Sequence, residues 1–276
     1  MSPEVLAALQ EAFARGQPVA LVTIVSARGS TPQRVGAKML VQADGRSVGT
    51  IGGGCYESDA VGRAREALRS RTTALVQYDL NDDVAEETGL ICGGQMQVFI
   101  EAVEPPPALY IIGAGHVGHQ LGRLAPAVGF RVHVVDDREK FANRARFPAA
   151  GSVHVADIGD WLAAADLPPS SYVVVVTRGH RHDFDALKAL AGRDLRYVGV
   201  IGSRAKLTRL VDLLLADGVS GAWLRELHAP IGLDIGAVTP EEIAVSILAE
   251  LIAVHRGRVG DGSAQPMQWA APALRS

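Results

Sequence analysis

Two cysteines set among glycines are the first residues in this sequence whose types and spacing suggest chemistry. Cys55 follows a run of three glycines and precedes a segment with helical spacing, and Cys92 lies in the run TGLICGG. The glycines beside the two thiols are Gly52, Gly53, Gly54 and Gly93. A helix N-terminus lowers the pKa of a thiol and offers amides to an anion, and glycines let a ligand approach the backbone. The alternative for either cysteine is a buried thiol that packs as a small apolar side chain.

A glycine motif typical of dinucleotide-binding proteins comes later in the chain. The run GAGHVG matches G-x-G-x-x-G and lies between an apolar run and a stretch with helical spacing that reaches residue 128. Its candidate contacts to a pyrophosphate at the helix N-terminus are Gly113, Gly115, His116 and Gly118. Asp136 ends the next apolar run, at the distance where a carboxylate binds a ribose hydroxyl. The alternative is a turn that only packs the helix on the strand.

Two further turns follow apolar runs in the second half of the chain. In GVIGSR, Gly202 and Ser203 could hold a second anionic group or could form an ordinary capped helix start. In TRGHRHD, His180, His182 and Asp183 suggest a metal site, but adjacency in sequence does not bring ligands together in space. We therefore expect Asp183 to cap a helix.

A polar loop over residues 28–38 is the remaining candidate for ligand recognition. Its sequence RGSTPQRVGAK combines hydroxyls, glycines and cations, which suit a phosphate or a carboxylate. The alternative is a solvated approach to a hairpin.

The elements that must position these residues fall into two groups. Residues 1–104 predict a smaller α+β domain. Its expected elements are helices at 3–15 and 56–69 and strands at 19–25, 38–42, 47–51, 73–78 and 95–102. The run EPPP at 104–107 then predicts a domain boundary, because consecutive prolines exclude both a helix interior and a central strand.

Beyond the prolines, apolar runs alternate with helical ones. The expected strands are at 109–112, 132–135, 153–156, 172–177 and 197–201. This alternation predicts an α/β, Rossmann-like domain with a doubly wound parallel sheet over residues 108–256. Its last helix begins with Thr239 as a capping residue, and the Gly- and Pro-rich residues 257–276 predict a flexible tail.

Composition excludes several classes of protein. The chain has 276 residues, of which 48% are hydrophobic and 21% charged, and its formal net charge of −3 disfavours a nucleic-acid partner. Its longest apolar stretch, 243–254, is shorter than the roughly 18 residues of a bilayer-spanning helix. The N-terminus does not have the pattern of a secretion signal, and two cysteines cannot make a disulfide framework. We expect a cytoplasmic protein that binds neither membranes nor nucleic acid.

Seven segments, taken together and in order, resemble the XdhC/CoxI family of xanthine dehydrogenase accessory proteins along nearly the whole chain. They are GSTPQRVGAKMLV, GTIGGGCYE, TGLICGG, LYIIGAGHVG, TRGHRHD, GVIGSRAKL and HAPIGLDIGAVTPEEIAVSI. Seven blocks in the same order are far more specific than one glycine motif.

The resemblance implies a maturation factor more than an enzyme. Such a chaperone would bind molybdenum cofactor, as molybdopterin or its cytosine dinucleotide, support its sulfuration by a cysteine desulfurase and insert it into a molybdenum hydroxylase of the xanthine dehydrogenase type. It would form a homodimer. The resemblance makes Cys55 and Cys92 candidates for transient contact with molybdenum, and makes the 113–118 motif with Asp136 a site for NAD(P) or another nucleotide.

Two other functions remain open. An NAD(P)-dependent oxidoreductase would use the Rossmann motif catalytically, although the sequence contains no recognisable hydride-transfer set such as Tyr-x-x-x-Lys. A scaffold would keep the fold without its ligand and would only dock the hydroxylase.

Overall fold

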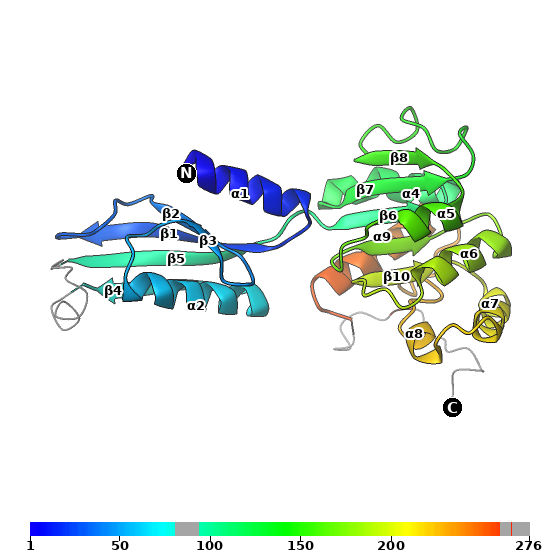
Figure 1. The fold of residues 1–276 in the computed structure, drawn as a ribbon. Helices are drawn as coiled ribbons and strands as arrows, with labels where there is room; N and C mark the ends of the chain where they lie inside the picture. The colour runs from blue at the N-terminus through cyan, green and yellow to red at the C-terminus, as the bar shows by residue number, and fades with distance from the viewer. Residues whose placement is uncertain (81–93, 260–265, 267–276) are drawn as a thin grey trace. The chain divides into compact units, whose positions relative to one another are not determined.

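The computed structural model describes residues 1–80, 94–259 and 266 of the chain. The chain divides into two compact units, Met1–Pro105 and Pro106–Ser276 (Figure 1). Within the described residues, no helix has the length and apolar character needed to cross a bilayer.

The first unit is built on an antiparallel sheet of five strands. In spatial order the strands are β3 (Ser47–Gly49), β2 (Lys38–Val41), β1 (Val19–Arg28), β5 (Gln95–Val103) and β4 (Thr73–Asp79). Successive residues of β1 point to opposite faces, so that Val19 and Leu21 join one apolar cluster while Ala20 and Val22 join another. The sheet therefore has two apolar faces to cover.

One helix packs on each face of this sheet. Helix α1 (Pro3–Ala14) contributes Val5 and Ala12 to the cluster that contains Val19. Helix α2 (Cys55–Ser70) buries Ala60, Ala64 and Ala67, whose spacing places them on one helix face. These small side chains let α2 lie close to the sheet, and its N-terminus carries Cys55.

The second unit contains a parallel sheet of five strands. In spatial order they are β10 (Tyr197–Val200), β9 (Tyr172–Val175), β6 (Ala108–Ile112), β7 (Arg131–Asp136) and β8 (Ser152–Val155). The chain starts in the middle strand, moves outward to β8 and then returns to the other side, which is the doubly wound order. The predicted α/β fold with a Rossmann-like second domain is confirmed.

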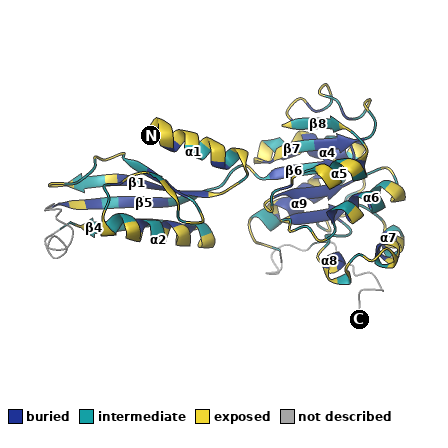
Figure 2. Ribbon diagram, in the orientation of Figure 1, coloured by how far each residue is buried: buried dark blue, intermediate teal, exposed yellow. Residues whose placement is uncertain are grey.

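Helices cover both faces of the parallel sheet (Figure 2). One face packs against α4 (His116–Leu124) and α9 (Pro240–His255), and the other packs against α5 (Ile158–Ala164), α6 (His180–Leu190) and α7 (Arg204–Ala216). A short α8 (Gly221–Arg225) follows α7. The carboxyl ends of the strands, where such sheets bind ligands, are followed by the loops that carry the predicted motifs.

Helix ends show where local patterns predict correctly and where they do not. Thr239 caps α9 in a capping box with Glu242, as predicted. The helix expected to reach residue 128 ends at Leu124 and continues as the 3₁₀ turn Ala125–Val128, which begins next to Pro126, a residue that cannot continue an α-helix. The expectation that Asp183 caps a helix is wrong, because Gly179 is the N-cap of α6.

Candidate functional site

The three-glycine turn before α2 has a backbone that requires glycine. Gly52, Gly53 and Gly54 have φ values of 129°, 78° and 79°. A Cβ on Gly52 would lie 2.7 Å from Cβ of Pro32, whereas a Cβ on Gly53 would meet nothing within 4 Å. The turn therefore packs against the 28–38 loop on one side and leaves open space at Gly53.

The carboxylate of Glu57 fixes the conformation of this turn through hydrogen bonds. Its Oε2 accepts hydrogen bonds from the Thr50 hydroxyl at 2.5 Å, the Ile51 amide at 3.0 Å and the Gly53 amide at 2.9 Å. Partial burial raises the pKa of Glu57, but the bonds from Thr50, Gly53 and Ile51 outweigh it and hold this pKa below its ordinary 4.5. The amide of Gly53, a glycine that the sequence offered to an anionic ligand, therefore already has a carboxylate partner, as does the amide of Ile51.

Cys55 is the first residue of α2 and is exposed to solvent. Gly54, the N-cap before it, has no side chain to cap the helix. The alternative of a buried, purely packing thiol is therefore wrong for Cys55. Cys92 and Gly93 lie outside the described residues.

The chain that follows Cys92 re-enters the described structure against the 28–38 loop. A Cβ on Gly94 would collide with the Ser30 carbonyl oxygen and lie 2.6 Å from that of Arg28. Because Gly52 also packs against this loop through Pro32, the loop contacts glycines from both cysteine segments. The spacing of these three segments in the sequence had neither predicted nor excluded their contact.

The glycines of the Rossmann motif have different structural roles. A Cβ on Gly113, which has a φ of 110°, would lie 2.5 Å from the Val176 carbonyl oxygen, and one on Gly118 would collide with the Gly113 carbonyl oxygen. A Cβ on Gly115 would meet nothing within 4 Å. Gly113 and Gly118 thus permit close packing, while Gly115 leaves open space in front of α4, which begins at His116.

Asp136 ends β7 as predicted, but an arginine already holds its carboxylate. Asp136 is 2% exposed and accepts hydrogen bonds from the Ala114 amide at 2.7 Å and from Arg138 Nε and Nη2 at 2.8 and 2.9 Å. Burial raises the pKa of Asp136, but the bonds from Arg138 and Ala114 hold it below its ordinary 3.8. A ribose hydroxyl at Asp136 would have to compete with this guanidinium.

A second arginine lies at the end of β9, on the other side of β6 from β7. Arg178, which follows β9, donates to Asp137 at 2.7 Å, and Asp137 also lies 3.7 Å from Arg138. Sequence reasoning missed Arg138 and Arg178. The signal that could have found them is an arginine close behind each of two parallel strands, whose carboxyl ends meet at one edge of the sheet.

The turn after β10 leads into a capped helix start, with a buried ion pair beside it. Ser203 is the N-cap of α7, directly after Gly202, and its hydroxyl accepts from the Lys206 amide at 3.3 Å. Lys206 Nζ lies 2.5 Å from the fully buried Asp183, which also accepts from the Thr177 hydroxyl. Asp183 therefore joins α6 to α7. The described residues contain no group of three or more His, Cys, Asp or Glu side chains placed to hold a metal ion.

One further buried carboxylate ties α9 to the turn-rich segment before it. Glu250 is fully buried and accepts from the Tyr197 hydroxyl at 2.6 Å and the Gly232 amide at 2.7 Å, and it lies 2.8 Å from Nδ1 of His228. The sequence assigned no role to His228. In the structure, this histidine contacts Glu250 and so joins the segment after α8 to α9.

Fold and site together define a two-domain α/β protein with an exposed thiol after a glycine turn and a Rossmann glycine motif. A family model described as "XdhC Rossmann domain" matches residues 109–251, and one described as "XdhC and CoxI family" matches residues 12–79. The chain belongs to the XdhC/CoxI family.

Several known proteins are similar to this chain. Uncharacterized protein YqeB of Escherichia coli is 37% identical over 88% of this chain, which spans only 44% of that relative's length. A probable xanthine dehydrogenase subunit of Bacillus subtilis is 27% identical over 86% of this chain and 93% of its own length. Molybdenum cofactor insertion chaperone PaoD of E. coli is 25% identical over 93% of this chain and 89% of its own length.

A solved structure is also similar to this chain. The crystal structure of a xanthine dehydrogenase from Bacillus halodurans is 26% identical and aligns with a TM-score of 0.51. The alignment covers 93% of this chain and 97% of that one, so the likeness extends over both units.

Proposed function

We propose that this protein binds molybdenum cofactor and inserts it into a molybdenum hydroxylase of the xanthine dehydrogenase type. The observation that carries the proposal is an exposed thiol, Cys55, directly after a glycine turn, in a chain similar over 93% of its length to a molybdenum cofactor insertion chaperone. The function is that of a maturation factor. Its cargo is the cofactor and its partner is the hydroxylase.

The chemistry of the first unit suits the metal end of the cofactor. A thiolate is a soft ligand, and Cys55 lies exposed at the first position of α2. Gly53 leaves open space in the turn before it. Because Glu57 already engages two of the turn's amides, we assign Cys55 to metal contact and do not assign the turn to phosphate binding.

The second unit suits the nucleotide end of a cofactor or a separate nucleotide. Gly115 leaves open space before α4, where a phosphate is favoured by the helix dipole. Arg138 and Arg178 lie at the carboxyl ends of β7 and β9, where a phosphate would exchange with the carboxylates of Asp136 and Asp137. We propose NAD(P), another nucleotide or the cytosine dinucleotide form of the cofactor as its ligand.

Several finer features complete the proposal. The protein would present the bound cofactor to a cysteine desulfurase for sulfuration, and Cys92 would act as a second thiol. Gly202 and Ser203 would contribute to anion binding. The working form would be a homodimer, the common symmetric assembly of soluble proteins, in the cytoplasm.

The test is cofactor retention. The protein is purified anaerobically from cells that make active molybdenum cofactor, and its molybdenum and pterin contents are measured by metal analysis and mass spectrometry. We expect near-stoichiometric molybdenum and pterin, and a loss of at least tenfold in a Cys55→Ser, Cys92→Ser double variant. The matched control is Ser58→Ala, which changes an exposed hydroxyl on the same helix. Unchanged retention in the double variant would refute the role of the thiols.

A second candidate function is an NAD(P)-dependent oxidoreductase, which the open space at Gly115 in a Rossmann motif favours. Saturable turnover of a nicotinamide cofactor, together with a purified protein that carries nicotinamide but neither molybdenum nor pterin, would decide for this candidate.

A further inference from the structure

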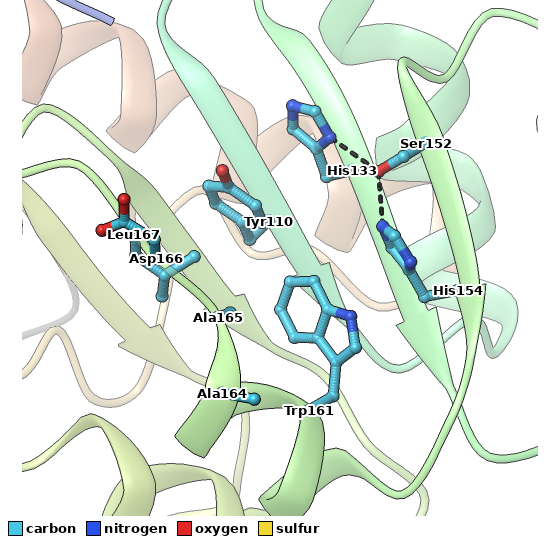
Figure 3. Close-up of a pocket in the computed structure, with 9 residues that line it drawn as sticks. All are labelled: Tyr110, His133, Ser152, His154, Trp161, Ala164, Ala165, Asp166 and Leu167. Atoms are coloured by element: carbon cyan, nitrogen blue, oxygen red, sulfur yellow. Dashed lines mark hydrogen bonds between the residues drawn. The ribbon is translucent and has the colours of Figure 1, made fainter. Parts of the chain in front are cut away.

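A pocket of about 310 Å³ lies in the second unit, on the sheet face that α5 covers (Figure 3). The residues that line it are Tyr110, His133, Ser152, His154, Trp161, Ala164, Ala165, Asp166 and Leu167. This lining includes no residue of the Rossmann motif and none of the described residues of the cysteine segments. Its volume is at the lower end of the range for small-molecule sites, which suits a ligand of one or two rings.

The walls of the pocket are formed by aromatic rings from three strands and one helix. Strand register places Tyr110 of β6 beside His133 of β7, and the two rings stack with centroids 4.8 Å apart and an interplanar angle of 19°. Trp161 of α5 lies 6.1 Å from Tyr110 and 5.1 Å from His154 of β8, measured between ring centroids. Such a set of rings favours a planar aromatic ligand, which stacks on them.

The polar groups of the pocket form a small network around one hydroxyl. Ser152 Oγ lies 2.8 Å from His133 Nδ1 and 2.8 Å from His154 Nε2, as the dashed lines in Figure 3 show. A hydroxyl has one proton, so Ser152 donates to one imidazole and accepts from the other. Nε2 of His133 is buried with no hydrogen-bond partner among the described residues. Because this atom is buried, the polar atoms of the network that the pocket offers to a ligand are those of Ser152 and His154.

The charge of the pocket disfavours an anion. None of its nine described lining residues is a lysine or an arginine, and one of them, Asp166, is a carboxylate. Burial lowers the pKa of His133 to about 4, so that its imidazole is uncharged at neutral pH. Phosphates and carboxylates therefore have no cationic partner among these lining residues.

We infer that this pocket is a binding site for an uncharged, planar nitrogen heterocycle of the size of a purine base. Trp161 stacks on the ring, Tyr110 completes the aromatic wall, and Ser152 with His154 recognises the ring nitrogens. The inference goes beyond the proposed function and does not depend on it, because the pocket shares no residue with the proposed cofactor sites.

Adenine tests the inference, since it is planar, carries ring nitrogens and is uncharged at neutral pH. Its binding to the full-length protein is measured by isothermal titration calorimetry and by saturation-transfer NMR, with cyclohexanecarboxamide as a saturated probe of similar size. We expect adenine to bind with a dissociation constant of millimolar or tighter, and the saturated probe to bind at least tenfold more weakly.

Variants locate the binding. Trp161→Leu removes the aromatic wall and should weaken adenine binding at least tenfold, whereas Trp161→Phe keeps a flat ring and should restore most of it. His154→Ala should also weaken binding, and its matched control is His180→Ala, an exposed histidine on α6. Thermal unfolding confirms that each variant is folded.

Three outcomes would overturn the inference. They are the absence of adenine binding, equal binding of the saturated probe, and adenine binding that neither Trp161→Leu nor His154→Ala changes. The measurement uses no molybdenum cofactor and no hydroxylase, so failure here is distinguishable from failure of the proposed function.

Discussion

At the scale of single residues, Glu57 shows how the protein keeps an exposed thiol in a defined place. Its carboxylate accepts from the Thr50 hydroxyl and from the Ile51 and Gly53 amides, so it fixes the turn that leads to Cys55. Hydrogen bonds to a charged acceptor are stronger than neutral ones. Glu57 is therefore a positioning residue for the thiol.

Glu57→Gln keeps the shape of the side chain and removes its charge. We expect a loss of about 1–2 kcal/mol in the free energy of unfolding at pH 7, measured by urea denaturation. The pKa of Glu57 is lowered in the folded protein, so its contribution is complete above the ordinary value of 4.5 and is lost as the pH falls through the lower folded value. The difference between wild type and variant should therefore shrink below about pH 4.5.

The matched control for this prediction is Glu66→Gln on the same helix. Glu66 is exposed and pairs only with Arg69 at the surface in the described structure. Exposed ion pairs contribute about 0–1 kcal/mol, so this variant should unfold nearly as wild type does. Equal losses in the two variants would show that Glu57 does not hold the turn.

At the scale of elements, the turn between β6 and α4 contains one glycine that permits close packing and another that leaves space for a ligand. A Cβ on Gly118 would collide with the Gly113 carbonyl oxygen, because α4 crosses closely over the end of β6. A Cβ on Gly115 would enter open space. The same chemical change at the two positions therefore tests two different properties.

Gly118→Ala should destabilise the second unit by about 2 kcal/mol or more, since neighbouring backbone must shift, and should lower the melting temperature by roughly 5 °C. Gly115→Ala should change the free energy of unfolding by no more than about 0.5 kcal/mol and should weaken the binding of ADP, used as a nucleotide probe. Thermal unfolding and calorimetry measure both. Equal melting temperatures for the two variants would contradict this division of roles.

At the scale of the whole molecule, each unit has its own apolar core. The clusters under α1 and α2 use residues of Met1–Pro105, and the two clusters on the parallel sheet use residues of Pro106–Ser276. Each unit has a length typical of an independent domain. The proposed division of the chain at the proline run rests on these separate cores.

Separate production of residues 1–105 and 106–276 tests this division. We expect each fragment to unfold cooperatively, as followed by circular dichroism against temperature. A control division after residue 129 separates β6 from β7 and β9, so the fragments 1–129 and 130–276 should not both fold. A fragment 1–105 or 106–276 that has no cooperative transition would show that the units stabilise each other.

The sequence alone predicted most of the elements. Periodicity, prolines and capping residues act over a few neighbours in the chain. They predicted the strands of both sheets, the start of α9 and the parallel sheet of the second domain. The resemblance of seven segments also led to the XdhC/CoxI family, which the comparisons confirm.

Only the tertiary structure decided which side chains meet. Strand ends and register bring Arg178 onto Asp137, Lys206 onto Asp183, and Tyr110, His133 and Ser152 onto one face of the sheet. A motif shows which residue types are present, but it does not show which side chain pairs with a given carboxylate. Such contacts depend on the packing of segments far apart in the chain, and this is why the aromatic pocket has no signature in the sequence.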